Sequence, residues 1–432
     1  MAPVLIAILS LTVLGIPFVL AVDRDAPPLR LLGLACLYGT GVIYFVLLAL
    51  SVLHVRWNLI SVTIAAIVVA VGARCAPRPV GAHSVRPRLH LVDLLTLLTS
   101  FAFASYATLA PLWEWDFWAI WGLKARVFLE VGGIDWRFLT SPWNTFAHLD
   151  YPLLLPFAYD FVALLGGGWS DRWLGLLFVA WALAFLLVAR ELAARETTPL
   201  VAALVAFALS SLAVSHYVGL AEGMLIAYLG AGVLFVRRAM LFDDDVAWRH
   251  GAILLGLAAC TKNEGLAMIA STAIAIVVSD VRRWRRVVRL WPAAAIALPW
   301  LVLRALHDLP TDVIGGSVAS RLVARLPEAG RIFAMLDAGL YEGWFWDALL
   351  LGIVAAPFVV WRRERFVLLA SLFQLGFYIG AYFVTPHDPA WHIRTSWPRL
   401  TAQIAAPLTY TVMIALANTL RETNAEARSE QP

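Results

Sequence analysis

Charged residues are scarce in this chain of 432 residues, of which only 14% are Asp, Glu, Lys or Arg. Soluble domains carry about 25% charged residues. Hydrophobic residues, by contrast, make up 61% of the chain, and the mean hydropathy is +0.79. Because so little charge cannot cover a water-exposed surface, the composition excludes an ordinary soluble domain and indicates a membrane protein.

Cysteine and lysine are also scarce. The three cysteines, Cys36, Cys75 and Cys260, stand at unrelated spacings, which argues against a disulfide framework or a zinc site. Lys124 and Lys262 are the only lysines among the 33 basic residues. The net charge of +4 does not indicate nucleic acid, because the basic residues are dispersed over short loops as in membrane proteins. We therefore expect membrane lipids, and no nucleic acid, as partners.

Long apolar runs are the main positive feature of the chain. Many of them continue for about 17–22 residues, the length that crosses a hydrocarbon core of about 30 Å. The runs are Met1–Val22, Leu31–Leu53, Leu59–Ala73, Leu91–Leu112, Trp173–Ala189, Leu200–Ser215, Met224–Val236, Leu290–Leu306, Ala348–Val360, Phe366–Val384 and Ala402–Leu420. The first run has no basic flank and no clear cleavage site, so we expect a retained helix and not a signal peptide. The pattern predicts an all-α polytopic membrane protein with about 13 transmembrane helices.

The basic loops decide the predicted orientation. The positive-inside rule places five of them in the cytoplasm: Arg74–Arg88, Arg190–Arg195, Arg237–Arg249, Arg282–Arg289 and Arg362–Arg365. The remaining loops then face the periplasm: Pro111–Arg172, His216–Glu222, His307–Trp344 and Pro386–Arg399. We therefore expect a multi-pass protein of the bacterial inner membrane whose polar loops lie on the periplasmic side.

Two segments do not fit simple membrane crossings. Tyr151–Leu165 cannot cross fully without placing a basic loop on the wrong side, so we expect a re-entrant or interfacial segment. His250–Val278 begins and ends at cytoplasmic charge and contains Thr261-Lys262-Asn263-Glu264-Gly265, which predicts two short helices that meet at a polar turn. Irregular backbone at membrane depth is tolerated only inside the protein or beside a water-filled cavity.

The first large periplasmic loop carries aromatic and acidic residues. Four of its apolar residues share one face at helical spacing, as in an interfacial helix: Trp118, Trp121, Ala125 and Phe128. Its carboxylates Glu114 and Asp116 stand two positions apart, and Asp150 follows in His148-Leu149-Asp150-Tyr151-Pro152. Carboxylates arranged in this way could supply a general base or bind a divalent cation.

Each of these residues also has a simpler interpretation. Asp116 precedes a helical stretch and could cap it, and Asp150 could organise a turn or cap the next helix. A single histidine such as His148 is more often a surface residue than a ligand. Ionisable groups at membrane depth are functional by default, however, which favours a functional role for the set.

The two lysines lie in polar segments. Lys124 follows the aromatic stretch of the first loop, and Lys262 lies in the predicted polar turn. The ammonium group of a lysine is a compact positive charge, so at either position it could bind a phosphate group. The alternative for Lys262 is a buried ion pair with Glu222 or Glu264.

The last predicted periplasmic segment, Thr385–Leu400, contains several basic side chains among aromatic residues. His387, His392, Arg394 and Arg399 lie where a helix re-enters the membrane, and the arginines could bind an anionic headgroup bidentately. Snorkelling to ordinary phospholipid is the alternative. A basic cluster on the non-cytoplasmic side runs against the topology rule, which favours function.

Five motifs in order resemble bacterial GT-C membrane glycosyltransferases. They resemble more narrowly those with a domain like the rhizobial lipopolysaccharide-core transferases, relatives of the protein O-mannosyltransferases and the lipid A aminoarabinose transferases. The motifs are Glu114-x-Asp116 with Trp118 to Ala125, His148-x-Asp150-Tyr151-Pro152, Gly219 to Glu222, Thr261 to Gly265, and Trp391-His392 to Arg399-Leu400. Related sequences usually carry Asp where Glu222 stands. The resemblance covers residues 91–420 as a catalytic module, after a three-helix extension (1–90) and before a cytoplasmic tail (421–432).

The resemblance implies transfer of a sugar from a polyprenyl-phosphate donor to a glycan, lipid or protein acceptor at the periplasmic face, with inversion. Asp116 would be the general base. Glu114 and Asp150 would orient the acceptor or, with Asp116, a divalent cation, the one cofactor that the pattern allows. Stabilisation of the leaving phosphate is assigned to four cations: Lys124, Lys262, Arg394 and Arg399. The remaining substrate-binding candidates are His148, Tyr151, Glu222, Glu264 and His392.

A polytopic transporter or lipid flippase is the alternative function. It would explain the many helices, the broken segment His250–Val278 and the intramembrane charges. Transporters usually contain internal repeats, and the sequence has none that we can detect. The charges also concentrate in the loops of one side, whereas a transporter should gather them near the midplane.

Overall fold

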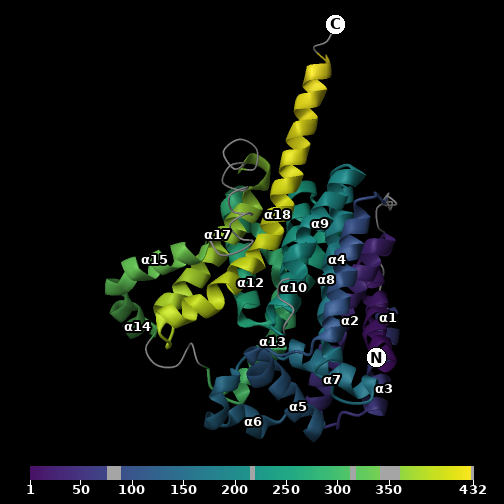
Figure 1. Ribbon diagram of the computed structural model, residues 1–432, viewed down its shortest axis with the longest axis vertical. Coiled ribbons are helices and arrows are strands. Elements are labelled where there is room, and N and C mark those ends of the chain that lie inside the picture. The colour runs from purple at the N-terminus through teal and green to yellow at the C-terminus, as the bar shows by residue number, and fades with distance from the viewer. Residues whose placement is uncertain (75–88, 215–218, 312–317, 341–360, 430–432) are drawn as a thin grey trace.

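The computed structural model describes residues 1–74, 89–214, 219–311, 318–340 and 361–429, and these residues form helices and connecting loops without any strand. The helices assemble into one bundle with a long C-terminal helix that extends beyond it (Figure 1). The predicted span Ala348–Val360 lies outside the described residues, as does most of the predicted basic loop Arg74–Arg88.

Seven segments of the described chain are long and apolar enough to cross a membrane. They include all or most of helices α1 (Ala2–Val22), α2 (Pro28–Val52), α8 (Leu176–Ala194), α10 (Glu222–Phe242), α13 (Trp291–Leu306), α17 (Trp361–Val384) and α18 (Pro389–Ser429). Five shorter apolar helices accompany them: α3 (Leu59–Arg74), α4 (Asp93–Leu109), α7 (Leu154–Gly166), α9 (Pro199–Val214) and α12 (Asn263–Ser279). The predicted class, an α-helical polytopic membrane protein, is confirmed, whereas the count of about 13 spans stays a prediction.

Small residues and lipid-facing side chains explain how the bundle packs. Helices α1 and α2 cross so closely that a Cβ atom on Gly39 would lie 1.7 Å from the carbonyl oxygen of Leu11, so only glycine fits there. On its outer side, α1 leaves Ile6, Leu9 and Val13 each 64% exposed. Such an apolar stripe is stable against lipid tails and not against water. Helix α10, in contrast, runs through the interior with most of its residues buried.

The predicted break near Lys262 is confirmed. Helix α11 (Asp245–Thr261) ends there, the backbone of Lys262 is extended at φ −156° and ψ 155°, and α12 begins at Asn263. Each helix has 17 residues; α11 begins five residues before the predicted segment His250–Val278, and α12 ends one residue after it. They pack side by side as a hairpin, and a Cβ atom on Gly265 would lie 2.3 Å from the carbonyl oxygen of Ala258. The hairpin therefore delivers the polar turn to the end of the bundle where α10 begins.

The first large loop folds into a layer of short helices at the lower end of Figure 1. It consists of a π-helical turn η1 (Phe117–Trp121), α5 (Gly122–Val131), α6 (Trp136–Thr140), the 3₁₀ turn η2 (Pro142–Ala147) and α7. Helix α7 has 13 residues, which span about 20 Å and fall short of a full crossing. It is buried against α1, α2 and α5. This agrees with the prediction that Tyr151–Leu165 does not cross the membrane fully.

The predicted interfacial helix is partly wrong. Trp121, Ala125 and Phe128 share one face as expected, but all three are completely buried in the protein and do not face lipid. Trp118 is 50% exposed and lies off that face. The reason is the π-helical turn, in which Gly122 N–H donates to the carbonyl of Phe117 and one extra residue per turn rotates Trp118 away.

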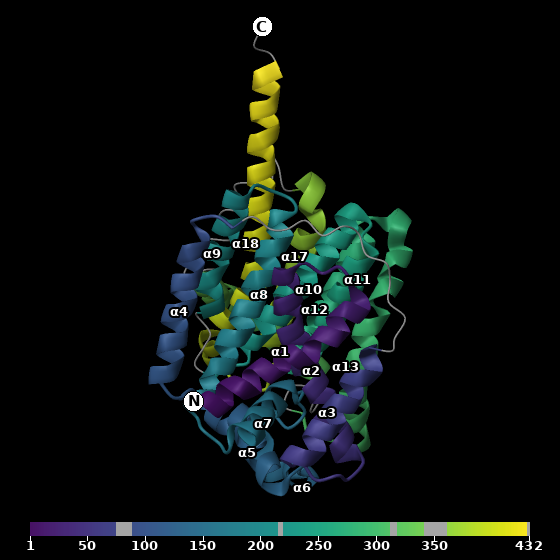
Figure 2. The same ribbon diagram turned by 90° about the vertical axis from the view of Figure 1, so that its right-hand side faces the viewer.

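Two further segments, a predicted loop and the predicted tail, contain helical structure. The predicted periplasmic loop His307–Trp344 contains α14 (Val318–Arg325), the 3₁₀ turn η5 (Leu326–Glu328) and α15 (Ala329–Leu340), which project from the side of the bundle (Figure 1). Helix α18 continues to Ser429 as the long helix at the top of Figure 2, so the described part of the predicted tail 421–432 is helical. The remaining short elements are η3 (Trp173–Gly175) and η4 (Val281–Leu290).

Candidate functional site

Five of the predicted site residues form one continuous ion-pair cluster: Asp116, Glu222, Lys262, Glu264 and Arg399. Arg399 Nη2 lies 2.5 Å from Asp116 Oδ2 and 3.0 Å from both carboxylate oxygens of Glu222. Lys262 Nζ lies 2.8 Å from Glu222 Oε1 and 2.7 Å from Glu264 Oε1. The Asp116–Arg399 contact joins residues that are 283 positions apart in the chain. The fold thus gathers the first loop, α10, the α11–α12 turn and α18 at one point.

Asp116 does not cap a helix. It occupies the position before the π-helical turn, but its carboxylate accepts no hydrogen bond from the backbone there. Instead the carboxylate contacts Arg399, and its side chain remains 19% exposed. The capping alternative for Asp116 is therefore wrong. A partly accessible carboxylate whose position is set by a cation is suited to accept a proton from a bound hydroxyl group.

Glu222 lies at the centre of the cluster. It is the first residue of α10 and is fully buried, so the positive end of the helix dipole favours its negative charge. A buried carboxylate is stable only when it is paired, and Glu222 pairs with Lys262 and Arg399 at once. The ion pairs that we set as the alternative for Lys262 are both present. Glu222 therefore holds two cations close together that would otherwise repel each other.

Asp150 lies next to the cluster and has its own partners. Its Oδ2 atom lies 3.4 Å from Asn263 Nδ2 and 3.3 Å from Arg304 Nη1, and its backbone carbonyl accepts from Trp300 Nε1 at 3.1 Å. Asn263 follows Lys262 directly, which connects Asp150 to the ion-pair cluster through the α11–α12 turn. No capping bond from the Asp150 side chain is present at the start of α7. The sequence did not single out Arg304 or Trp300, because both lie in an ordinary apolar helix, α13.

His148, Tyr151 and Lys124 form a supporting turn. His148 has a left-handed backbone (φ 49°), and its ring stacks on Tyr151 with 4.7 Å between the ring centroids. Lys124 is completely buried, donates to the carbonyl of His148 at 2.5 Å, and lies 5.8 Å from the Tyr151 ring. In this position Lys124 stabilises the turn that carries Asp150. The predicted contact of Lys124 with a phosphate finds no support in this arrangement.

The segment after α17 places His392 beside the cluster and leaves Arg394 outside it. His392 Nδ1 lies 2.9 Å from Thr385 Oγ1, and its ring meets Tyr382 edge-on at 5.0 Å between centroids. The hydroxyl oxygen of Tyr382 in turn lies 2.9 Å from Ser396 Oγ, which is one helical turn after His392 in α18. Arg394 is exposed on α18, and no described contact links it to the cluster. Glu114 is half-buried, and its described hydrogen bonds involve its backbone carbonyl.

The three predicted metal ligands do not converge. Asp116 contacts Arg399, and Asp150 contacts Arg304. Within the residues that the structure describes, no group of three or more His, Cys, Asp or Glu side chains is arranged to hold a metal ion. A cation already occupies the space beside each of Asp116 and Asp150, so the residues present do not fit a divalent cation.

Several polar atoms of the site lack an internal partner. Among the described residues, Arg399 Nε, Asn263 Oδ1 and Glu264 Oε2 are buried and make no hydrogen bond. Buried polar atoms in folded proteins are nearly always paired, so three unpaired atoms at one point suggest a site for a polar ligand. The cluster offers this ligand a guanidinium N–H group together with two acceptor oxygens.

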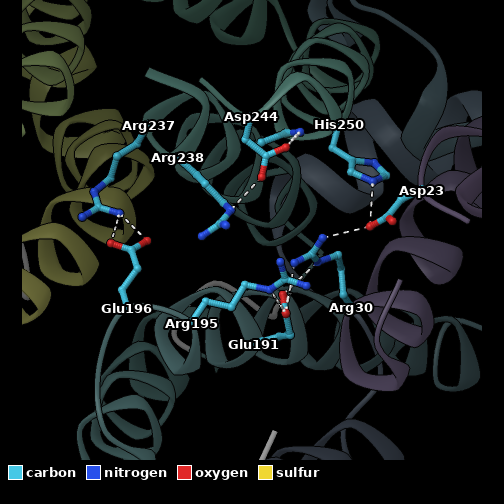
Figure 3. A network of polar contacts seen from close by, with 10 residues as sticks. Asp23, Arg30, Glu191, Arg195, Glu196, Arg237, Arg238, Asp244 and His250 are labelled. Atoms are coloured by element: carbon cyan, nitrogen blue, oxygen red, sulfur yellow. Dashed lines mark hydrogen bonds and ion pairs between the residues drawn. The ribbon is translucent and has the colours of Figure 1, made fainter. Parts of the chain in front are cut away.

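A second charged network lies toward the other end of α10 (Figure 3). Arg30 Nε lies 2.8 Å from Glu191 Oε2 and Arg30 Nη1 lies 2.8 Å from Asp23 Oδ2. Arg237 contacts Glu196 at 2.9 Å and also binds Glu364. Arg237 follows Glu222 by 15 positions in one helix, so the two networks are about 22 Å apart.

The second network connects helix ends and is explained by packing. Asp23 follows α1, Arg30 belongs to α2, Glu191 to α8 and Arg237 to α10. Burial alone would raise the pKa of Asp23, but the His250 ring and the Arg30 guanidinium lower it below its ordinary value. The sequence shows these residues only as loop charges, and their pairing depends on how the helices pack. An open cavity of about 390 Å³ nearby is lined by Glu196, Arg363, Asn418, Arg421 and Glu422, far from the ion-pair cluster.

Comparison with protein-family models, with curated proteins and with solved structures finds no match to this chain. The ion-pair cluster and the motif resemblance are therefore the two indications of function.

Proposed function

We propose that this chain is a membrane glycosyltransferase of the GT-C type in the bacterial inner membrane. It would transfer a sugar from a polyprenyl-phosphate donor to a glycan, lipid or protein acceptor at the periplasmic face, with inversion. The observation that carries the proposal is the pairing of Asp116 with Arg399 inside a cluster that retains unpaired polar atoms. A potential base and a potential phosphate ligand thus lie in direct contact.

The chemistry follows from these two side chains. The acceptor oxygen attacks the anomeric carbon of the donor while Asp116 takes the proton of the acceptor hydroxyl group. The bond between the anomeric carbon and the phosphate oxygen breaks, and its electron pair leaves with the lipid phosphate. Arg399 and Lys262 stabilise the negative charge that grows on this leaving group. Because attack and departure occur on opposite sides of the carbon, the configuration inverts.

Glu222 supports the proposal as a positioning residue. Its carboxylate lies 2.8 Å from Lys262 Nζ and 3.0 Å from Arg399 Nη2, which sets the two cations at a separation that one phosphate group could bridge. Related sequences usually carry the shorter Asp at this position. The longer side chain here reaches both cations from the first turn of α10.

The test is glycosyl transfer by the purified protein in nanodiscs with a panel of polyprenyl-phosphate sugars and crude envelope acceptors. Asp116→Asn removes the base while it keeps the size of the side chain, and we expect a loss of about 100-fold or more in turnover. Asp135→Asn is the matched control, because Asp135 caps α6 in the same loop and asparagine caps equally well. Equal turnover in both variants would reduce Asp116 to a structural role.

A polytopic transporter or lipid flippase is the second candidate. The broken α11–α12 hairpin favours it, since transporters place interrupted helices with charged turns at their binding sites. The same nanodisc protein, reconstituted into liposomes, decides between the two. Movement of labelled lipid or sugar across the liposome without any glycosyl transfer would support transport and contradict the transferase.

A further inference from the structure

Helix α14 and the turn after it expose their apolar side chains. Leu322 is 41% exposed, Val323 66% and Leu326 57%. The side chain of Arg325 is only 25% exposed, and its Nη2 atom donates to the backbone carbonyl of His387 at 3.3 Å. A soluble helix would bury the apolar groups and leave arginine in water. The observed arrangement is stable where lipid tails surround the helix.

The position of α14 places this apolar surface at the flank of the bundle. Helix α14 packs against α17, and α15 packs against α18. Phe333 of α15 meets Phe383 of α17 with 5.9 Å between ring centroids, which fixes the pair of helices beside the α17–α18 turn. Figure 1 shows α14 and α15 projecting sideways from the bundle and not from one of its ends. This surface is therefore open to a lipid that lies beside the bundle.

A stripe of polar side chains leads from α14 to the ion-pair cluster. Arg325 contacts the carbonyl of His387, and the ring of His387 lies 5.9 Å from that of His392. Along α18, His392, Ser396 and Arg399 are spaced four and three positions apart, so they share one face of the helix. The seven positions from His392 to Arg399 span about 10 Å. The stripe therefore connects the lipid-facing α14 with the guanidinium that contacts Asp116.

Two acidic side chains beside this path, Glu328 and Asp388, already have hydrogen-bond or ion-pair partners. Glu328 lies 3.2 Å from Arg325, and its side chain is 39% exposed. The side chain of Asp388 accepts the backbone N–H of Trp391 at 2.9 Å and thereby caps α18. An anion that replaced Glu328 beside Arg325 would therefore gain a cation without displacing a buried carboxylate.

We propose that α14 and the α17–α18 turn form an entry site for a lipid phosphate, in which α14 contacts the lipid chain and Arg325 binds the phosphate. The phosphate then moves along the stripe of His392 and Ser396 to Arg399. The identification of this lipid as the sugar donor rests on the proposed function. Binding of the lipid phosphate itself needs neither a sugar nor an acceptor, and it can be tested separately.

The experiment measures binding of farnesyl phosphate to the full chain in detergent by native mass spectrometry. We expect Arg325→Gln to weaken binding about fivefold to tenfold, because it removes one charge-assisted hydrogen bond. Arg325→Lys keeps the charge and should bind within about twofold of the wild type. Arg331→Gln is the matched control, since Arg331 is an exposed arginine on the neighbouring helix α15. Farnesol, which lacks the phosphate, should bind all variants equally weakly.

The outcomes separate this inference from the proposed function. Equal binding of farnesyl phosphate by Arg325→Gln and Arg331→Gln would overturn the entry site, as would an equal loss of farnesol binding in Arg325→Gln. If Arg325→Gln loses farnesyl phosphate while the wild type transfers no sugar from any donor, the entry site stands and the transferase falls. If transfer occurs but binding is independent of Arg325, the transferase stands and the entry site falls.

Discussion

Replacement of Glu222 by glutamine tests the electrostatic reasoning behind the site most directly. The change keeps the shape of the side chain but removes the negative charge between Lys262 and Arg399, which lie 2.8 Å and 3.0 Å from the carboxylate. At an effective dielectric constant of about 20, each contact is worth about 6 kcal/mol before desolvation is counted. Lys262 and Arg399 would then face each other across a neutral amide, each with one carboxylate left, Glu264 for Lys262 and Asp116 for Arg399.

The expected loss of stability is smaller than the Coulomb energy, because the substitution also removes the cost of burying the charged carboxylate. Breaking a buried ion pair by removal of one partner destabilises proteins by about 3–5 kcal/mol, and we expect a loss in this range for Glu222→Gln. Glu222→Asp keeps the charge on a shorter side chain and should cost less. The measurement is the free energy of unfolding in mixed detergent micelles with increasing denaturant.

Asp243→Asn is the matched control for this prediction. Asp243 is 64% exposed and pairs with Arg286 and, at 3.6 Å, with Arg283, so these surface ion pairs should contribute about 0–1 kcal/mol each. Asp243 has a left-handed backbone (φ 51°), which asparagine tolerates. If Glu222→Gln lowers the free energy of unfolding no more than Asp243→Asn does, the cluster is not the buried ion-pair site described above.

Three further predictions concern the supporting structure. Gly265→Ala should force α11 and α12 apart, because the new Cβ would lie 2.3 Å from the carbonyl of Ala258. A thermal melt should show that the free energy of unfolding falls by about 1–3 kcal/mol. The exposed change Gly330→Ala should not reproduce this loss. Arg237→Gln should destabilise the chain by about 3–5 kcal/mol because it leaves Glu196 and Glu364 buried without their cation; an unchanged denaturant midpoint would contradict this assignment. Burial would raise the pKa of Asp244, but the backbone N–H of Ala247 and the charge of Arg238 lower it. The ionised carboxylate therefore stabilises the folded protein above about pH 4, and this contribution is lost as the pH falls further. The melting temperatures of the wild type and Asp244→Ala should therefore differ at pH 7 and converge at low pH, and a constant difference would show that Asp244 does not titrate in this way.

Part of the site was predictable because its signals are local. The scarcity of charge and the long apolar runs determine a helical membrane protein, since only segments of that length and composition satisfy their backbone inside lipid. The polar turn at Lys262 interrupts an apolar segment and was predicted for the same reason. Asp116, Glu222 and Arg399 could be singled out because ionisable side chains are costly at membrane depth.

Other features depended on tertiary packing and left no local signal. Whether Asp116 caps a helix or contacts Arg399 depends on two segments that are 283 positions apart in sequence. Arg304 looked like an ordinary arginine in an apolar helix until the fold placed it beside Asp150. Lys124 looked like a ligand residue, but packing buries it under the His148–Tyr151 turn.

By itself, the sequence determined that this chain is a helical membrane protein, where its helices break and which residue types are unusual for lipid. These properties follow from hydrophobicity and backbone hydrogen bonding, which act over neighbouring residues. The tertiary structure alone decided which charges meet, which become buried and which side chains of α14 stay exposed. Such pairings depend on the crossing of distant helices, because a charge is stable inside a membrane only where the fold brings its partner to it.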